Sequence, residues 1–475
     1  MYIDGQWIEA AGGRRFEVFN PATGEVIGSM PDGDSTDAVR AIEAAARALP
    51  AWAATTAYAR SAILLKAWQL MMARKEALAE LMTAEQGKPL KAARNEVQYA
   101  ADFLQWFAEE AKRIYGETIP SARADQRFIV AHQPVGVVAA VTPWNYPVSM
   151  ITRKLAPALA AGCTVVLKPA EATPLCAKAV FEILQEAGLP AGVVNLVSAA
   201  DPRPIGEAFT THPAVRKLTF TGSTAVGKQL AREAAGHMKR VSMELGGHAP
   251  FIVFDDVDAG HAAKGAALVK FLNTGQACIS PNRFLVHDRG ADAFVDTLAG
   301  RIRAMKAGNG MDSATAIGPL INEAAIAKIE AQVDDALAKG ATLVCGGERL
   351  RGGDLARGCF YAPTLLDHVT PEMRIYREET FGPVAPVVRF GDADDVLAMA
   401  NDTAFGLAAY VYTRDVGRAF RMFEGLHFGI IGINDINPTS AAAPFGGMKD
   451  SGLGREGARE GIMEYLETKL GGWAV

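Results

Sequence analysis

The chain has 475 residues, too many for one hydrophobic core, so two or three domains are expected. Its 49% hydrophobic and 21% charged residues are ordinary for a soluble enzyme. The net charge of −5, without any cluster of lysine and arginine, argues against nucleic acid as the main partner, and no apolar run approaches the roughly 18 residues of a membrane span.

Hairpins are expected first, because residues 1–35 are rich in glycine and proline and carry short apolar alternations. From Ser35 to Ile114, apolar residues recur at three- and four-residue spacing, which predicts helices that wrap a sheet. The run Val135–Val141 is then continuously apolar and is closed by a threonine and a proline. Such a run is typical of a buried parallel strand.

Strands and helices alternate after this strand, which predicts a parallel α/β sheet with ligands at the carboxyl ends of its strands. The expected elements are a helix from Val148, strand 164–168, helix 174–187, strand 193–197, helix 205–210, strand 217–221 and helix 225–235. A second α/β series comprises strand 248–254, helices near 258–272, 291–305 and 322–339, and strands near 283–287, 383–390, 410–413 and 429–433. The two lobes are expected to join near Gly246. Residues 346–358 predict a surface loop, and residues 465–470 a strand added to a neighbouring chain.

The five cysteines are odd in number and widely spaced, which fits a reducing compartment better than a disulfide framework. Residues 1–5 lack a basic segment followed by an apolar one, so no secretory signal is expected. The eight histidines form no HExxH pattern, and the cysteines no paired spacing, so no metal site is expected. These features predict a cytoplasmic protein without a metal.

One cysteine is a candidate nucleophile. The helical pattern 262–272 ends at Asn273 and Gly275, and Cys278 lies between this end and the expected strand 283–287. A thiol at such a turn is rigidly held, close to backbone N–H groups that favour its thiolate or receive an oxyanion. The alternative is a half-buried small hydrophobic residue in a loop.

The stretch Gly222-Ser-Thr-Ala-Val-Gly-Lys-Gln229 lies between an expected strand and an expected helix. It begins like the phosphate loop of nucleoside triphosphatases, but that loop needs Ser or Thr where this chain has Gln229. A triphosphatase is therefore disfavoured. A helix N-terminus of small residues remains, which suits a pyrophosphate such as that of a dinucleotide.

Lys168 and Glu171 follow another strand of the same predicted sheet. Both side chains can reach the hydroxyls of an adenosine ribose there, and a carboxylate favours free hydroxyls over a 2′-phosphate. The alternative is a solvated ion pair at a helix start, where an acid suits the helix dipole.

Two further polar residues are candidates for a site. Asn145 stands between two prolines that stiffen its turn, so its amide can serve as a fixed oxyanion donor, or else bond its own turn. Glu244 ends an apolar strand before two glycines. A carboxyl in apolar surroundings has a raised pKa and can act as a general base, whereas the alternative is an exposed loop acid.

In this order and spacing, six motifs resemble the NAD(P)-dependent aldehyde dehydrogenase superfamily over nearly the whole chain. They are Pro143-Trp-Asn-Tyr-Pro147, Phe220-Thr-Gly-Ser223, Glu244-Leu-Gly-Gly247, Gly275-Gln-Ala-Cys278, Glu379-Thr-Phe-Gly-Pro383 and Pro444-Phe-Gly-Gly447. The resemblance implies an α/β fold of two Rossmann-like lobes with a small β oligomerisation arm, assembled as a dimer or tetramer. The implied parts are an NAD-binding domain (1–117 and 135–246), a catalytic domain (247–440), and the arm with the C-terminal tail (118–134 and 441–475).

The resemblance also implies roles for single residues. Cys278 corresponds to the nucleophile, Asn145 with the backbone N–H of Cys278 to the oxyanion site, and Glu244 to the base that activates water. The implied cofactor is NAD, with NADP used less well. The positions implied for its binding are Thr142, Trp144, Lys168, Glu171, Phe220, Ser223, Leu245, Glu379 and Phe381.

Within the superfamily, the chain is most similar to succinate-semialdehyde dehydrogenases and related ω-oxo-acid enzymes. An arginine at the position of Arg153 binds the substrate carboxylate in that group, although an exposed helix arginine is the alternative here. Three positions depart from the group: Leu272 replaces a second arginine, Asp435 stands in an unusual loop, and Ser280 replaces a redox cysteine. A hydroxy-, sulfo- or amino-aldehyde is therefore an alternative substrate, and a non-catalytic dinucleotide-binding relative is a more distant one.

Overall fold

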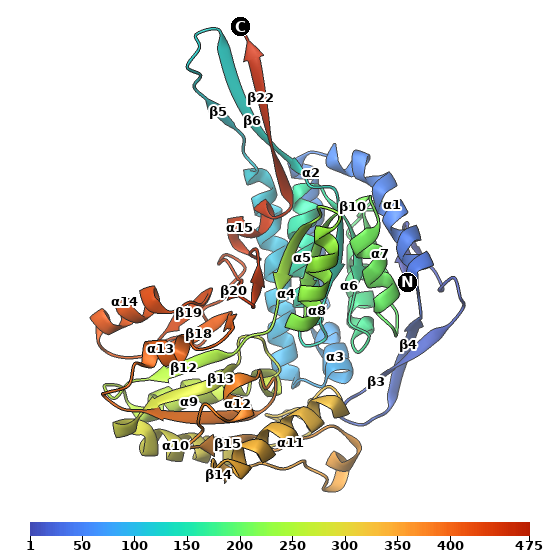
Figure 1. Cartoon of the computed structure of the whole chain (residues 1–475). Coiled ribbons are helices and arrows are strands. Elements are labelled where there is room, and N and C mark those ends of the chain that lie inside the picture. The colour runs from blue at the N-terminus through green and yellow to red at the C-terminus, as the bar shows by residue number, and fades with distance from the viewer.

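The computed structural model describes residues 1–475 and shows two α/β lobes and a narrow arm of three strands that projects from the first lobe (Figure 1). The chain begins with two hairpins on the first lobe, as expected: β1 (Tyr2–Ile3) with β2 (Gln6–Trp7), and β3 (Arg15–Phe19) with β4 (Val26–Pro31). No helix is both long enough and apolar enough to cross a membrane.

The first lobe is built on an eight-stranded sheet of order β2-β1-β9-β8-β7-β10-β11-β21. Its parallel centre consists of β9 (Val194–Leu196), β8 (Thr164–Lys168), β7 (Val137–Val141), β10 (Val215–Thr221) and β11 (Arg240–Glu244). A short strand from the C-terminal segment, β21 (Gly452–Leu453), pairs antiparallel with β11. The connections reverse direction between β7 and β10, so a crevice is expected at the carboxyl ends of these two strands.

Eight helices cover this sheet. They are α1 (Ser35–Ala53), α2 (Ala57–Ala73), α3 (Lys75–Gln86), α4 (Leu90–Glu110), α5 (Ser149–Ala161), α6 (Pro174–Glu186), α7 (Arg203–Thr211) and α8 (Thr224–Ala235). Capping residues mark where the helical run that the sequence predicts from Ser35 begins and where it breaks. Asp34 forms a capping box at the start of α1, and α3 ends at Gly87, whose φ of +91° suits glycine.

The second lobe contains a seven-stranded sheet of order β14-β15-β16-β13-β12-β18-β19. Its strands are β12 (Ala249–Val253), β13 (Pro281–His287), β14 (Thr342–Cys345), β15 (Thr364–Asp367), β16 (Val384–Phe390), β18 (Ala408–Tyr412) and β19 (Ile430–Ile433). All are parallel except β14. Its helices are α9 (Ala259–Lys270), α10 (Asp288–Arg303), α11 (Glu323–Ala338), α12 (Arg374–Arg377), α13 (Val396–Asn401) and α14 (Val416–Gly425). The predicted α/β order is confirmed in both lobes.

The arm is a three-stranded antiparallel sheet of β5 (Glu117–Ile119), β6 (Gln126–Pro134) and β22 (Leu466–Ala474). Strand β22 pairs over nine residues with β6 of its own chain, from Leu466↔Pro134 to Ala474↔Gln126. Its other edge has no strand partner, so the expected pairing with a neighbouring chain stays a prediction. The preceding helix α15 (Ala458–Met463) packs on α4 and α5.

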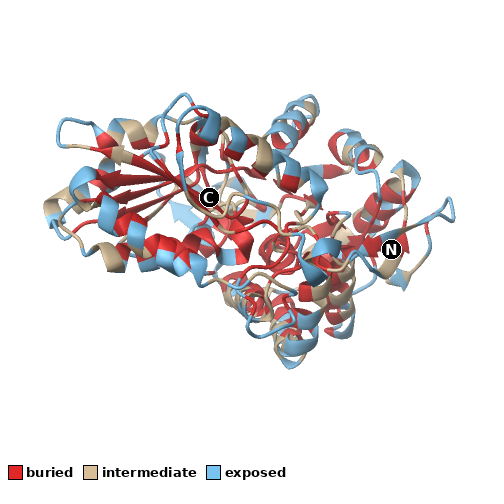
Figure 2. Cartoon of the chain, turned by 90° about the horizontal axis from the view of Figure 1, so that it is seen from below, coloured by how far each residue is buried: buried red, intermediate tan, exposed pale blue.

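The main sheet of each lobe is buried on both faces, as Figure 2 shows by red strands between helices with pale blue outer surfaces. Alternate residues of β7 enter different cores: Val138 and Ala140 pack with α2 to α6, and Val137 and Ala139 with α1, α7 and α8. The second lobe repeats this arrangement, with Phe251 on one side of its sheet and Ile252 on the other. Continuous apolar strands are therefore required in both lobes.

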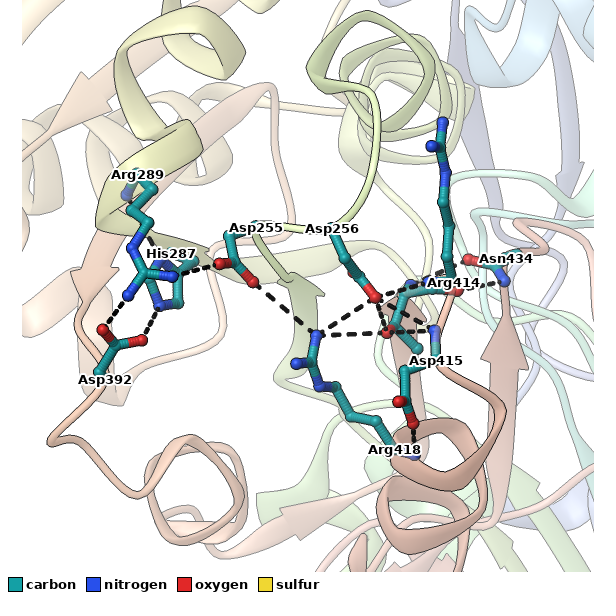
Figure 3. Close-up of polar contacts among 10 residues, drawn as sticks. Asp255, Asp256, His287, Arg289, Asp392, Arg414, Asp415, Arg418 and Asn434 are labelled. Atoms are coloured by element: carbon teal, nitrogen blue, oxygen red, sulfur yellow. Dashed lines mark hydrogen bonds and ion pairs between the residues drawn. The ribbon is translucent and has the colours of Figure 1, made fainter.

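Charged side chains close the carboxyl edge of the second sheet (Figure 3). Arg289, just after β13, bridges Asp255 after β12 and Asp392 after β16. Asp256 accepts hydrogen bonds from the Thr413 hydroxyl (2.9 Å) and from two backbone N–H groups that follow β18. This edge, where an α/β sheet usually binds its ligand, is therefore occupied by the side chains of the chain itself.

Candidate active site

A cavity of about 410 Å³ lies between the two lobes. The first lobe contributes the sides of α4 and α5, and the second contributes the end of α9, the segment that leads into β13, and the loop after β19. Its lining is mostly apolar and includes Tyr99, Met150, Arg153, Leu268, Leu272, Cys278, Ile279, Ile436, Asn437, Thr439 and Phe445. A thiol and a guanidinium thus open into one apolar chamber.

The segment before Cys278 has an unusual backbone. Asn273, Thr274 and Gly275 all have positive φ angles (49°, 59° and 75°). A Cβ on Gly275 would lie 2.1 Å from the Gly382 carbonyl oxygen, so only glycine fits there. Gln276 attaches this segment to residues 319–321, because its side chain donates to the Pro319 carbonyl (3.2 Å) and accepts from the Ile321 N–H (3.0 Å).

Cys278 is half-buried at the cavity wall. Burial raises the pKa of its thiol to about 12, although Arg153 opposes that shift. The thiol is therefore protonated at neutral pH, and a base must take its proton before the sulfur can attack a carbonyl.

Glu244 ends β11 with both carboxylate oxygens buried and without a hydrogen-bond partner. Burial raises its pKa well above the usual value, and the charge of Glu456 adds to this. The backbone of Gly446 passes close to this carboxyl, because a Cβ there would lie 2.9 Å from Oε1 of Glu244. A Cβ on Gly247 would lie 2.4 Å from the carbonyl oxygen of Cys278, so the backbone after Glu244 also passes close to the cysteine. Glu244 is therefore buried, with the charges of Arg153 and Glu456 acting on it, and an exposed loop acid is excluded.

The amide of Asn145 reaches residues 273–278, which we call the nucleophile loop, and does not bond its own turn. Its Nδ2 donates to the Gln276 carbonyl at 3.0 Å, which leaves a second N–H of the same amide free. Its Oδ1 is buried without a partner. The orientation therefore suits a donor aimed at the region beside Cys278.

Arg153, on α5, is buried at the cavity wall, which excludes the alternative of an exposed helix arginine. Its guanidinium lies over the Phe445 ring, 4.0 Å from the centroid, and 2.9 Å from Glu456. Lys154 contacts the same carboxylate at 2.7 Å. Nε of Arg153 has no hydrogen-bond partner, so this arginine retains a donor for a further anion.

The residues assigned to a dinucleotide line the carboxyl edge of the first sheet. Thr142 follows β7, Lys168 ends β8 and Glu171 follows it, Phe220 lies in β10, and Leu245 follows β11. Lys168 Nζ lies 3.0 Å from Oε2 of Glu171, whose side chain is 51% exposed. The structure thus contains the ion pair of the alternative interpretation at the place where a ribose is expected.

Three further features suit a dinucleotide. Ser223 caps α8, whose first N–H groups remain free for an anion by helix geometry. A Cβ on Gly227 would lie 2.2 Å from Leu245, so glycine is needed for this close packing. Across the crevice, Trp144 and Phe381 meet edge-to-face at 5.6 Å, and Glu379 accepts the Gly247 N–H at 2.9 Å. The site offers ribose partners, an anion-binding helix start and aromatic rings, as a dinucleotide requires.

The three departures from the semialdehyde group are placed as follows. Leu272 lines the cavity and is 40% exposed. Asp435 lies outside the cavity lining and accepts the Asn437 N–H in its own loop (3.0 Å), so it does not face the chamber. Ser280 is buried, and its hydroxyl donates to the Lys270 carbonyl at 3.2 Å.

Sequence reasoning missed four buried charged residues around the site: Lys88, Glu96, Lys154 and Glu456. Glu456 stands at the end of the glycine-rich loop that the sequence singles out, but nothing in the pattern assigns it a partner. Lys88 and Glu96 lie in helical surroundings, where charged residues normally face solvent. Their burial results from packing between α4, α5 and the nucleophile loop.

Comparison with known proteins agrees with this geometry. The profile described as "Aldehyde dehydrogenase family" matches residues 7–470. A glutarate-semialdehyde dehydrogenase of Pseudomonas putida is 52% identical over 98% of this chain and 96% of its own length. A succinate-semialdehyde dehydrogenase (NADP(+)) of Escherichia coli is 52% identical over the same shares of the two chains. The crystal structure of an E. coli NADP-dependent enzyme superposes with a TM-score of 0.98 at 51% identity, covering 100% of this chain and 98% of that chain.

Proposed function

This chain belongs to the aldehyde dehydrogenase family, and we propose that it oxidises a small semialdehyde to its carboxylic acid at Cys278, with NAD as the preferred hydride acceptor. It is therefore an oxidoreductase. The observation that carries the proposal is a thiol at the cavity wall, with a fixed amide donor bound to the loop before it and a buried, unpartnered carboxyl whose charge acts on the thiol.

In the first step, the Cys278 sulfur forms a bond to the aldehyde carbon, and the carbonyl oxygen takes up the electron pair. We assign the thiol proton to Glu244, because its two oxygens have no other partner. The free N–H of Asn145 and the backbone N–H of Cys278 donate to the oxyanion. The two N–H groups thus stabilise the negative charge on the former carbonyl oxygen, and Glu244 holds the proton that the thiol has lost.

NAD, when bound, supplies the hydride acceptor that turns the adduct carbon into a thioester. The chain then has to hydrolyse that thioester. Glu244 first releases the thiol proton to solvent and then takes a proton from water, whose oxygen attacks the thioester carbon. The C–S bond breaks, and the sulfur takes the proton from Glu244. The carboxylic acid leaves, and Cys278 returns to its initial state.

The semialdehyde carboxylate is assigned to Arg153. This residue faces the same cavity as Cys278, and its Nε lacks a partner. Both curated relatives carry semialdehyde names. Leu268 and Leu272, which are 56% and 40% exposed, give the chamber an apolar wall that suits the methylene chain of an ω-oxo acid.

The test is NADH formation with succinate semialdehyde, glutarate semialdehyde and propanal, in the wild type and two variants. Cys278→Ala is expected to abolish turnover with all three and to leave NAD binding intact. Arg153→Met is expected to lower kcat/KM about 10- to 100-fold for the two semialdehydes and little for propanal, on the scale of a charged hydrogen bond. Residual turnover in the first variant would refute the nucleophile, and equal losses in the second would refute the carboxylate contact.

The preference for NAD over NADP rests on Glu171, whose half-exposed carboxylate would repel a 2′-phosphate. The chain uses these nicotinamide cofactors as its family does, and one curated relative is named for NADP(+). Direct comparison of the two cofactors with one aldehyde measures the preference.

We also propose that the protein is a homodimer or homotetramer in the cytoplasm. The arm strand β22 has one unpaired edge, and its Leu470 and Trp473 are 63% and 50% exposed, as an assembly surface would be. All five cysteines are free, which suits a reducing compartment. The domain division is kept as 1–117 with 135–246, 247–440, and 118–134 with 441–475. The two separate sheets and the arm support this division.

A further inference from the structure

The turn that carries Asn145 is held from outside by a buried lysine. Nζ of Lys88 donates to the Asn145 backbone carbonyl at 2.7 Å, and Nδ2 of Asn273 donates to the same oxygen at 3.0 Å. Lys88 follows α3, more than 50 residues before this turn, and its side chain is 1% exposed. A buried ammonium is costly unless it is paired, so its position requires an explanation.

The partner of Lys88 is Glu96, on α4, which is equally buried. One carboxylate oxygen of Glu96 pairs with Lys88, and the other accepts the N–H groups of Val148 (3.0 Å) and Ser149 (3.1 Å). These two N–H groups begin α5, which has no side-chain cap of its own. The ion pair therefore binds the turn 145–149 at both ends, with Lys88 at the Asn145 carbonyl and Glu96 at the N–H groups of Val148 and Ser149.

We propose that the Lys88–Glu96 pair is the positioning device of the oxyanion donor: it fixes the turn 145–149 so that the Asn145 amide faces the nucleophile loop. The inference rests on the proposed function, in which Asn145 binds the oxyanion. A preorganised donor must be held within about 0.5 Å of its productive place, because its advantage over water is that it does not need to reorient.

Lys88 also lines the cavity, so a direct contact with the substrate carboxylate is the rival role. Its ammonium, however, has three protons and three partners. They are the Glu96 carboxylate, the Asn145 carbonyl and the face of the Tyr146 ring, whose centroid is 4.1 Å away. No proton remains for a substrate, which favours the positioning role.

The experiment uses the full-length double variant Lys88→Met/Glu96→Gln. The glutamine keeps a carbonyl oxygen for the α5 N–H groups, and no buried charge is left unpaired. Expected results are a kcat about 10-fold lower with both succinate semialdehyde and propanal, and KM values within about twofold of the wild type. The NAD dissociation constant and the rate of Cys278 alkylation by iodoacetamide, which forms no oxyanion, should stay unchanged.

A double-mutant cycle with Asn145→Ala separates this inference from the proposed function. If the pair acts through Asn145, its removal lowers kcat about 10-fold in the wild type and by less than about twofold in the Asn145→Ala background. Equal factors in both backgrounds overturn the inference, as does a KM increase confined to succinate semialdehyde. A full loss in Asn145→Ala with none in the pair variant overturns only the inference. Full activity of Asn145→Ala overturns the oxyanion role together with the inference.

Lys239→Met is the matched control. Lys239 is 7% exposed and donates to the His212 and Val215 carbonyls at the amino edge of the first sheet, opposite the site. Its loss should lower the melting temperature and leave kcat unchanged. A similar kcat loss in this control would mean that removing any buried lysine suffices, and the positioning role would be overturned.

Discussion

Burial favours the protonated form of the two side chains proposed to react, Cys278 and Glu244. A protonated thiol resists oxidation and alkylation, and it becomes a nucleophile only when a base removes its proton. A carboxyl with a raised pKa is the stronger base when it is ionised. Burial thus accounts for a thiol that stays protonated at rest and for a carboxyl that is a strong base once it is ionised.

Replacing Glu244 with Gln tests the base. We expect kcat to fall by about 10²- to 10⁴-fold, the usual contribution of general base catalysis. Since the ionised form is the base and predominates above its pKa, thioester hydrolysis in the wild type should accelerate as pH rises through the elevated pKa of Glu244. The same step should be independent of pH in the variant. Stopped-flow NADH bursts and steady-state rates across pH measure both steps, and an unchanged kcat would contradict the assignment.

Replacing Glu171 with Ser tests the cofactor preference. Removal of a half-exposed carboxylate beside the expected 2′ position should raise kcat/KM for NADP relative to NAD by about five- to tenfold, on the scale of a surface charge contact. The KM for the aldehyde should stay the same. A constant NADP-to-NAD ratio would place the ribose contact elsewhere.

At the scale of elements, the two sheets meet the site with opposite ends. The first sheet presents the carboxyl ends of its strands, as Glu244 at the end of β11 and Lys168 at the end of β8 show. The second presents the amino ends, because Cys278 precedes β13 and Glu379 precedes β16. The other edge of the second sheet contains the charged network of Figure 3. That network has a structural role and adds nothing to the chemistry at Cys278.

The network yields a stability prediction at Asp256. Burial opposes its ionisation, but hydrogen bonds from Thr413 and from the N–H groups of Arg414 and Asp415 outweigh this and lower its pKa. A depressed pKa contributes stability above the unfolded value of about 3.9, and that contribution is lost as pH falls through the folded pKa. Asp256→Asn should therefore lose about 1–2 kcal/mol of unfolding free energy at pH 7 and much less below about pH 4.

Denaturant unfolding at several pH values measures this difference. The matched control is Asp255→Asn, because Asp255 pairs with the exposed Arg289 (2.7 Å), and exposed ion pairs contribute little. Its loss at pH 7 should stay below about 1 kcal/mol. Equal losses for the two variants, or a loss at Asp256 that does not change with pH, would contradict the account.

At the scale of the molecule, the arm is the part least explained by a single chain. Strand β22 stands at the edge of its sheet, with exposed apolar side chains at Leu470 and Trp473 and at Val475 just after it. Isolated edges of this kind invite pairing with another chain. The core of each lobe, by contrast, is complete within the chain.

The double variant Leu470→Glu/Trp473→Glu tests the arm as an assembly surface. We expect a smaller species by light scattering and a lower melting temperature, because charge in a buried interface costs more than the lost apolar contact alone. Leu343→Glu, at a comparably exposed leucine (41%) on the edge strand β14, is the control and should leave the mass unchanged. A variant that retains the mass of the wild type would place the interface elsewhere.

The sequence by itself determined the two-lobe α/β order, the nucleophile loop and the aldehyde dehydrogenase family. These features depend on local periodicity and on short motifs, such as the glycines beside Cys278, that a single stretch of chain contains. Only the tertiary structure decided the own-chain pairing of β22 with β6, the salt bridge between Arg153 and Glu456, and the position of Lys88 under the Asn145 turn. The partners in these contacts stand about 60 to 350 residues apart, and no local pattern encodes which of many charged or extended segments will be buried against each other.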